Sequence, residues 1–186
     1  DPAVPVMPLG LGSNLIGVAG QKVGVPFPVF ARAHLLRSCG SDVDLGRHCP
    51  ACGSDRHGRP WARLPDGSRP HVSLARCGDV VVTAVDPLRP VGVDVEVIAA
   101  VDARWDPDLV LAPGERADSP AERAAMWCRK EAILKALGTG LRTPMSRVQC
   151  ADWPVVDLVA PPGLAAAAVV LPPTAGQSGS GGSSTV

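Results

Sequence analysis

Apolar and polar residues alternate most regularly between residues 91 and 97, which read Val-Gly-Val-Asp-Val-Glu-Val. Successive side chains of a strand point to opposite faces, so the pattern predicts a strand with its valines on one face and Gly92, Asp94 and Glu96 on the other. The Cα atoms of the two acidic residues would then lie about 6.5–7 Å apart, with both carboxylates on one face.

A helical repeat predicts one helix over residues 120–137, with an apolar stripe at Met126, Ile133 and Leu137. The flanking residues supply an N-cap, a proline at the first position, a capping box and terminal glycines: Ser119, Pro120, Glu122, Gly138 and Gly140. Glu131 and Lys135 are four residues apart and share one face of this helix. Taken alone, they would form a surface ion pair worth about 0.3–0.5 kcal/mol.

Weaker patterns predict the remaining elements. Residues 1–28 are rich in proline and glycine and are expected to form a loop-rich arm, followed by a short helix over 29–39 and a polar, turn-rich segment over 40–70. Short strands are expected at 72–74, 79–85, 148–150, 153–160 and 164–171, although four alanines leave a helix possible for the last. A polar loop is expected over 102–118, and the Gly/Ser-rich residues 172–186 are expected to be disordered.

Composition narrows the class of protein. The chain has 186 residues, 46% of them hydrophobic, which is enough to bury the core of one domain or of two small subdomains. Lys+Arg and Asp+Glu both total 18, so net charge does not indicate a nucleic-acid partner. The apolar run at 158–171 is interrupted by proline and too short to cross a bilayer, and the N-terminal run lacks a basic leader. We therefore expect a soluble, cytoplasmic monomer without a membrane partner.

Asp94 and Glu96 are the first candidates for chemistry. Two carboxylates this close repel each other unless one is protonated or a cation lies between them. Mg²⁺ suits them, because it takes one or two carboxylates and leaves positions for water and phosphate. The alternative is the solvated face of an edge strand.

Cys49 and Cys52, in Cys-Pro-Ala-Cys, make half of a zinc knuckle. A structural zinc site needs four ligands, and Cys39 and His57 are the residues available to complete it. The sequence contains no second Cys-x-x-Cys, so a plain cysteine-containing turn is the other interpretation.

Arg32, Arg59 and Arg76 are basic residues close to turns. The planar fork of an arginine is well suited to phosphate, although each of the three, taken singly, is equally consistent with a surface charge.

Four motifs follow one another along the chain: Gly-Arg-Pro (58–60), Ser-Leu-Ala-Arg-Cys-Gly (73–78), Gly-Val-Asp-Val-Glu (92–96) and Trp-Cys-Arg-Lys-Glu-Ala-Ile-Leu-Lys (127–135). Over roughly residues 30–171 their order and separation resemble the 4′-phosphopantetheinyl transferase superfamily, and more closely its longer, pseudo-dimeric type that activates peptide and polyketide synthetases. The resemblance implies an α+β fold of two similar α/β subdomains related by a pseudo-twofold, with the active site in the cleft between them. We accordingly expect a coenzyme A-side subdomain at 29–88 and a subdomain with the metal and catalytic motifs at 89–171.

The same resemblance implies roles for individual residues. Asp94, Glu96 and Glu131 are expected to bind Mg²⁺, and Glu131 and Lys135 to be catalytic. Residues expected to contact coenzyme A are Arg59, Ser73, Arg76, Asp94, Lys135 and, as a weaker match, Arg32. Glu115 resembles an acidic position in a loop before the helix, a loop that is shortened here. Ala75 and Arg76 depart from the family, which has Ser and His at these positions.

The implied activity is the Mg²⁺-dependent transfer of 4′-phosphopantetheine from coenzyme A to a serine of an apo acyl- or peptidyl-carrier protein, with release of adenosine 3′,5′-bisphosphate. Two alternatives stay open. One is a paralogue that binds coenzyme A or a carrier without turnover, suggested by Ala75 and Arg76. The other is a zinc-stabilised interaction module built on Cys49 and Cys52, in which the acidic residues are merely exposed.

Overall fold

The structure, a computed structural model, describes residues 6–7, 15–20, 32–33, 36 and 42–173. Its strands are β1 (Val6–Met7), β2 (Leu15–Gly20), β3 (Asp44–His48), β4 (Arg59–Arg63), β5 (His71–Cys77), β6 (Val80–Asp86), β7 (Val91–Val97), β8 (Val155–Asp157) and β9 (Leu164–Val170). Its helices are α2 (Ile98–Asp102), α3 (Pro107–Val110) and α4 (Pro120–Leu137), with 3₁₀ turns η1 (Gly140–Arg142), η2 (Met145–Arg147) and η3 (Cys150–Asp152). The expected mixed α+β content is confirmed.

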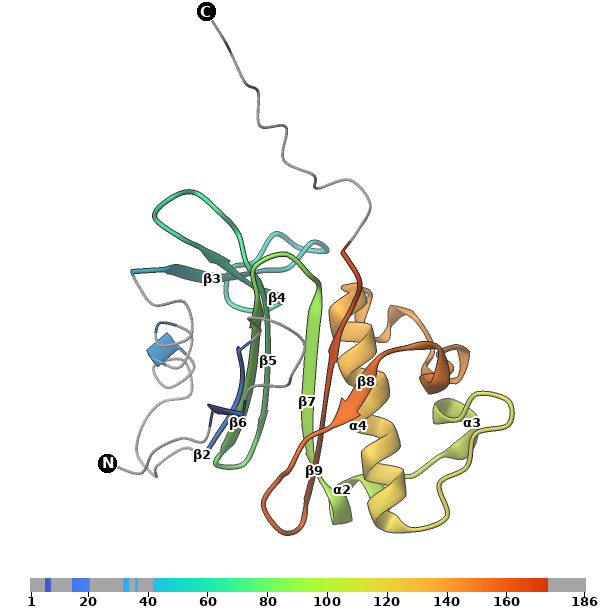
Figure 1. Cartoon of the computed structure of the whole chain (residues 1–186). Helices are drawn as coiled ribbons and strands as arrows, with labels where there is room; N and C mark the ends of the chain where they lie inside the picture. Colours follow the sequence, from blue (N-terminus) through green and yellow to red (C-terminus); the bar gives the residue numbers. More distant parts are fainter. Residues whose placement is uncertain (1–5, 8–14, 21–31, 34–35, 37–41, 174–186) are drawn as a thin grey trace, which may run out of the picture.

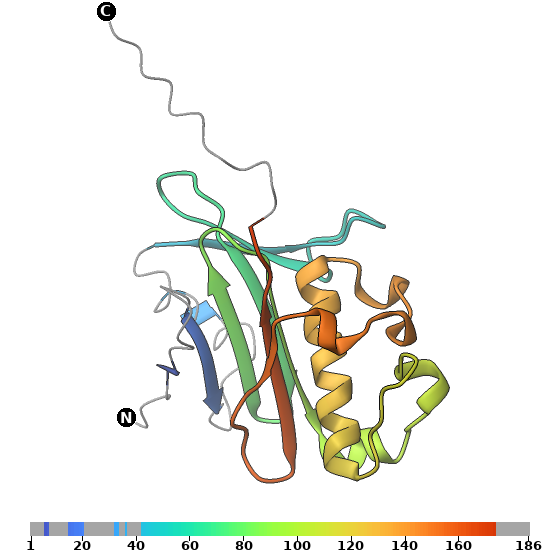
Figure 2. The same cartoon turned by 45° about the vertical axis from the view of Figure 1, so that its right-hand side comes forward.

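Two antiparallel sheets and one long helix form successive layers. One sheet has the strand order β1-β2-β6-β5 and the other β7-β9-β8, while β3 and β4 pair as a separate hairpin. Figures 1 and 2 show β5 and β6 facing β7 and β9, with α4 on the far side of that second sheet. An apolar cluster that includes Ala75, Val82, Val93 and Ala168 fills the space between the sheets. The predicted pseudo-twofold and subdomain boundaries stay predictions.

Strand β7 is buried on both faces. Its valines Val91, Val93 and Val95 join the cluster between the sheets. Its other face lies against α4, and a Cβ added at Gly92 would come within 1.8 Å of the carbonyl oxygen of Ala132. A glycine is therefore required where strand and helix backbones approach this closely. The solvated-face interpretation of Asp94 is wrong, because Asp94 is 4% exposed.

Helix α4 begins and ends as its sequence predicts. The Ser119 side chain accepts a hydrogen bond from the Glu122 backbone N–H, and the Glu122 carboxylate accepts one from the Ser119 N–H, which completes the capping box. Gly138 ends the helix in the left-handed conformation, with φ of 71°. Leu137, predicted to be buried, is 38% exposed because it lies on the last turn, beyond the sheet that covers Ile133.

Several weaker expectations are wrong, and in each case the determining contacts are distant in sequence. Residues 15–20 form strand β2 instead of a loop, because they pair antiparallel with the valine-rich β6. The turn-rich segment 40–70 contains the β3–β4 hairpin. The short helix α3 interrupts the expected loop at 102–118, and α2 ends where that loop begins. Residues 148–149 lie between two 3₁₀ turns, and Cys150 begins the second of them, so the expected strand at 148–150 is absent from these residues. Residues 164–170 form a strand, so the helical alternative fails.

Two expectations fall largely outside the described residues. In the predicted helix at 29–39, residues 32, 33 and 36 are helical, and the others are not described. The expected disordered tail lies outside the described residues from 174 onward. Among the helices that are described, none combines the length and apolar character needed to cross a membrane.

Candidate functional site

Asp94 lies in the interior, where β7 faces α4. Lys135 Nζ, on the last turn of α4, donates to Asp94 Oδ1 at 2.6 Å and to the Val93 carbonyl oxygen at 3.1 Å. Within the described part of the chain, the second carboxylate oxygen of Asp94, Oδ2, is buried without a hydrogen-bond partner. A buried, unpaired carboxylate oxygen is costly, so this atom is a natural position for a proton or a cation.

Glu96 and Glu131 add two further carboxylates around Asp94. Both are half-buried, Glu96 on β7 and Glu131 one turn before Lys135 on α4. Desolvation, followed by the charge of Asp94, raises the pKa of Glu96. Desolvation also raises the pKa of Glu131, against the opposing charge of Lys135 and with support from Asp94 and Glu96. The pKa of Asp94 is raised by desolvation as well, although Lys135 opposes the shift.

This acidic site, defined by Asp94, Glu96 and Glu131 with Lys135, has the donor chemistry of a divalent-cation site. Three carboxylates whose pKa values are all raised gain most from a cation that neutralises them. Carboxylate oxygens are the ligands that Mg²⁺ prefers. The oxygens of these three carboxylates do not all lie within 4.8 Å of one another. Within the described part of the chain, the one set of three ligating atoms that does so belongs to other residues. The orphaned Oδ2 and the donor set fit the predicted metal.

Two thiols line the acidic site, and the sequence patterns did not single them out. Cys128, buried on α4, donates to the Ala165 carbonyl oxygen, and burial together with the charge of Asp94 raises its pKa. Cys77, at the end of β5, has its pKa raised by desolvation and by Glu96. Both thiols stay protonated at neutral pH, so they line the site as neutral groups and not as nucleophiles.

Lys130 is the largest fully buried side chain of α4 and was not predicted to be one. Its Nζ forms an ion pair with Glu115 Oε2 at 2.5 Å and donates to the carbonyl oxygens of Met145 and Val148 at 3.1 and 2.7 Å. Glu115 accepts two backbone N–H bonds, from Ala112 and Cys150. The pair therefore ties the loop before α4 to the segment after it. The sequence did contain a signal for the burial of this lysine, which is next to Glu131: the residues three and four positions away from it in the helix are apolar.

Glu115 is thus a structural anion and lies on the opposite side of α4 from the acidic site. Burial raises the pKa of its carboxyl, but the Cys150 N–H, Lys130 and the Ala112 N–H outweigh this and hold the pKa below its usual range. The resemblance pointed to an acidic residue in this loop, and the structure gives that residue a partner.

Arg59 reaches the end of α4 nearest to Lys135. It lies at the tip end of the β3–β4 hairpin, paired in register with His48. A Cβ added at Gly138 would lie 2.5 Å from Nη1 of Arg59, so the guanidinium rests over the last turn of α4. The predicted coenzyme A-binding arginine therefore adds positive charge at the end of α4 that carries Lys135.

Ser73 and Arg76 are not placed as ligand-binding residues would be. Ser73 is 4% exposed, and its Oγ accepts the N–H of Val93, so it bridges the two sheets. Arg76 lies on the other face of β5, with Val72 and Leu74, and its Nε donates to the Gly78 carbonyl oxygen. Alternation along β5 thus directs Arg76 away from Asp94.

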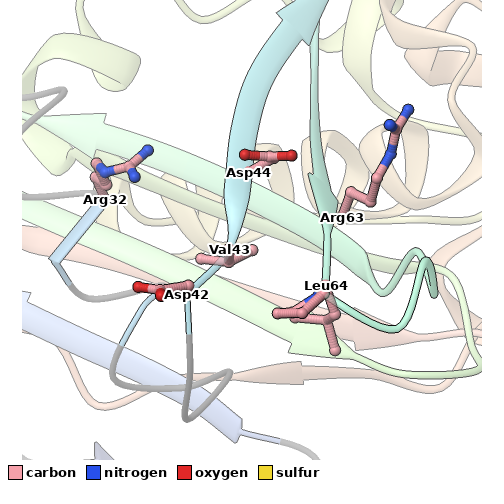
Figure 3. Close-up of a pocket in the computed structure, with 7 residues that line it drawn as sticks. Arg32, Asp42, Val43, Asp44, Arg63 and Leu64 are labelled. Carbon is pink, nitrogen blue, oxygen red and sulfur yellow. The ribbon is translucent and has the colours of Figure 1, made fainter.

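Arg32 lines a separate hollow of about 320 Å³ at the open end of the hairpin. Figure 3 shows Arg32 there with Asp44 and Arg63. Asp44 pairs with Arg63 in register, and His48 pairs with Arg59. Four residues of strand separate the hollow from Arg59, or about 13 Å. The structure therefore does not bring Arg32 and Arg59 together.

Residues 90–159 match the family model of the 4′-phosphopantetheinyl transferase superfamily. The matched range covers less than half of the chain, and it contains Asp94, Glu96, Glu131 and Lys135 but not Arg32, Arg59, Ser73 or Arg76. No curated protein sequence matches the chain. The match supports a transferase and, in general terms, phosphopantetheine transfer.

Proposed function

We propose that the protein transfers 4′-phosphopantetheine from coenzyme A to a serine hydroxyl of an apo acyl- or peptidyl-carrier protein, with Mg²⁺ as cofactor. The observation that carries the proposal is the buried Asp94 carboxylate, which has one oxygen on Lys135 and, among the residues that the structure describes, no partner for the other. The family match over residues 90–159 covers both elements that build this site.

Asp94, Glu96 and Glu131 are the residues that would hold Mg²⁺. When bound, the ion would supply positive charge that offsets the charge on the pyrophosphate oxygens of coenzyme A. The raised pKa values of all three carboxyls favour this assignment, since a bound cation offsets the desolvation that raises them and, for Glu96 and Glu131, the added repulsion from neighbouring carboxylates.

The reaction breaks one bond of coenzyme A and forms one bond to the carrier serine, and side chains of this protein assist both. The serine oxygen forms a new bond to the β-phosphorus of coenzyme A, and the bond from that phosphorus to the bridging oxygen breaks. The leaving group is adenosine 3′,5′-bisphosphate. Glu131, with a raised pKa, is suited to accept the serine proton. Lys135 and Arg59 are the cations placed to bind phosphate near the end of α4.

The test of this function is to incubate the full chain with coenzyme A, Mg²⁺ and a panel of apo acyl- and peptidyl-carrier proteins, and to weigh each carrier by mass spectrometry. We expect at least one carrier to gain a phosphopantetheine group, and the gain to disappear when EDTA replaces Mg²⁺. If no carrier in the panel gains the group, the transferase proposal fails.

The second candidate is a paralogue that binds coenzyme A without turnover. The observation that favours it is the position of Arg76, which replaces the histidine of the family pattern and lies on the face of β5 away from Asp94. Calorimetric binding of coenzyme A together with an unmodified carrier panel would select this candidate. The zinc-module alternative is contradicted in one part, because it takes the acidic residues to be exposed and Asp94 is buried.

Substitution of Glu131 by glutamine should stabilise the metal-free protein at neutral pH. The folded-state pKa of Glu131 is raised above its unfolded value of about 4.3. A carboxyl of this kind favours folding below pH 4.3 and loses that contribution as the pH rises through the folded pKa. A neutral glutamine avoids the loss, so we expect the variant to melt up to about 4 °C higher at pH 7.5 in EDTA, and the difference to vanish near pH 4.5.

Glu122→Gln is the matched control on the same helix. Backbone N–H groups of Ser119 and Asp118 lower the pKa of Glu122, so its charge favours folding at neutral pH and its removal has the opposite sign. Mg²⁺ should raise the melting temperature of the wild-type protein more than that of Glu131→Gln. Equal Mg²⁺ responses would remove Glu131 from the metal site.

A further inference from the structure

Two thiols and an imidazole meet at the tip of the β3–β4 hairpin, apart from the acidic site. One ligand atom from each of Cys49, Cys52 and His57 lies within 4.8 Å of the other two. Cys52 Sγ lies 3.4 Å from His57 Nε2. The sequence named Cys39 and His57 as residues that could join the two cysteines. The structure places His57 at the same point, and Cys39 lies outside the described residues.

The chain between the cysteines has the form of a metal-binding turn. The Gly53 N–H donates to the Cys49 carbonyl oxygen at 2.8 Å, and the Cys49 N–H donates to Ser54 at 2.9 Å. Gly53 takes a φ of 71°, which favours glycine at this position. Cysteine binds a metal as the thiolate, and this turn brings the Cys49 and Cys52 thiols to one point.

We propose that Cys49, Cys52 and His57 bind one zinc ion, with water in the fourth position. Two sulfurs and one imidazole nitrogen form a donor set that zinc favours and that Mg²⁺, which takes oxygen ligands, does not. One thiol and the imidazole are exposed, so the ion would be open to solvent on one side. Zinc binding at this site does not depend on whether the protein is a transferase.

The zinc site would also position Arg59. His57 and Arg59 are separated by Gly58, whose φ is 97° and whose added Cβ would lie 2.4 Å from the His48 carbonyl oxygen. The link is therefore short and closely packed against the other strand. Arg142, in the turn after α4, is close enough for its charge to act on the Cys49 thiol, so the tip lies beside the end of α4. A metal bound at the tip would hold the Arg59 guanidinium over Gly138.

The first experiment measures metal alone. The full chain, purified with a reducing agent, is titrated with Zn²⁺ against a competing chelator, and with Co²⁺ to record the thiolate-to-cobalt charge-transfer band. We expect one equivalent of tightly bound Zn²⁺ and a thiolate band. Cys52→Ser and His57→Gln should each weaken Zn²⁺ binding at least about tenfold, since loss of a group that only hydrogen-bonds a metal ligand already costs about 10–100-fold. Cys150→Ser, which alters a half-buried thiol outside the zinc site, should bind Zn²⁺ like the wild type.

Absence of stoichiometric Zn²⁺, unchanged affinity in both ligand variants, or a Cys49–Cys52 disulfide that persists in the reducing agent would each overturn the zinc site. Circular dichroism confirms that the variants fold, and the exposed position of the tip predicts that they do.

A second experiment tests the positioning of Arg59 and rests on the proposed function. Removing zinc with a selective chelator, in excess Mg²⁺, should raise the KM for coenzyme A several-fold with little change in kcat, and Zn²⁺ should restore it. Arg59→Ala should show the same rise and no response to zinc. A zinc-independent KM in the wild type would overturn the positioning role. If no transfer occurs at all, the proposed function fails while the metal titration still decides the zinc site.

Discussion

Substitution of Lys130 by methionine is expected to lower the free energy of unfolding by about 3–5 kcal/mol, the cost of removing one partner from a buried ion pair. Lys130 is 0% exposed and satisfies all three of its N–H donors, on Glu115, Met145 and Val148. Methionine fills a similar volume but leaves two carbonyl oxygens and the buried Glu115 carboxylate without their cation. The change should also loosen the 145–150 segment, which Lys130 connects to α4.

Urea unfolding of the full chain measures the effect, and two further variants isolate its cause. Arg129→Ala, at the preceding position of the same helix, breaks a half-exposed ion pair with Asp157 and should lower the free energy of unfolding by no more than about 1 kcal/mol. Lys130→Met combined with Glu115→Gln should recover part of the loss, because it removes the uncompensated anion. A Lys130→Met variant as stable as Arg129→Ala would show that the buried pair contributes little.

The sequence predicted the elements that carry the acidic site. The alternating valines define β7 at the same bounds as the structure, and the capping box and Gly138 define α4. Both signals are local: one is the period of two of a strand, and the other is a set of hydrogen bonds within one turn. The grouping of Asp94 and Glu96 also follows from their spacing, and their proximity to Glu131 came from the family resemblance.

What the sequence left out depends on partners far along the chain. Alternation places Asp94 opposite the valines but does not reveal that α4 covers that face, because the contact needs Gly92 to admit the helix backbone. Strand β2 takes its conformation from β6, more than sixty residues away. Lys130 reads as one more charge on a helix until the carbonyl oxygens of the following segment close over it.

The basic residues show the limit of a motif as a guide to position. Arg32, Arg59 and Arg76 were grouped because each is suited to phosphate, yet they lie in three different places. Arg59 is at the end of α4, Arg32 at the open end of the hairpin and Arg76 on the outer face of β5. Strand parity decides the case of Arg76, since a residue one position away would face Asp94 instead. Of the three, Arg59 is the one that lies at the end of α4 that also carries Lys135.

Asp94→Asn is expected to reduce phosphopantetheine transfer at least about 100-fold, or about 2.7 kcal/mol of transition-state stabilisation. Asparagine keeps the shape of the side chain and can still accept from Lys135, but it removes the charge that would hold Mg²⁺. Lys135 would also lose its charged partner. Because the buried charge of Asp94 is itself costly, the metal-free variant should be at least as stable as the wild type.

Asp86→Asn is the matched control, since Asp86 is a second aspartate of similar burial that pairs with a basic residue, Arg89. Asp86 accepts hydrogen bonds from the Leu88 and Arg89 N–H groups in the turn before β7, so its substitution should lower stability and leave transfer by the folded protein within a few-fold of wild type. Asp94→Asn is thus expected to lose transfer without losing stability, and Asp86→Asn to lose stability without losing transfer. Initial rates with saturating carrier, measured across a Mg²⁺ titration, give the comparison. If Asp94→Asn keeps the wild-type rate and the wild-type Mg²⁺ dependence, Asp94 is not a metal ligand, and the buried unpaired oxygen must be explained by a proton.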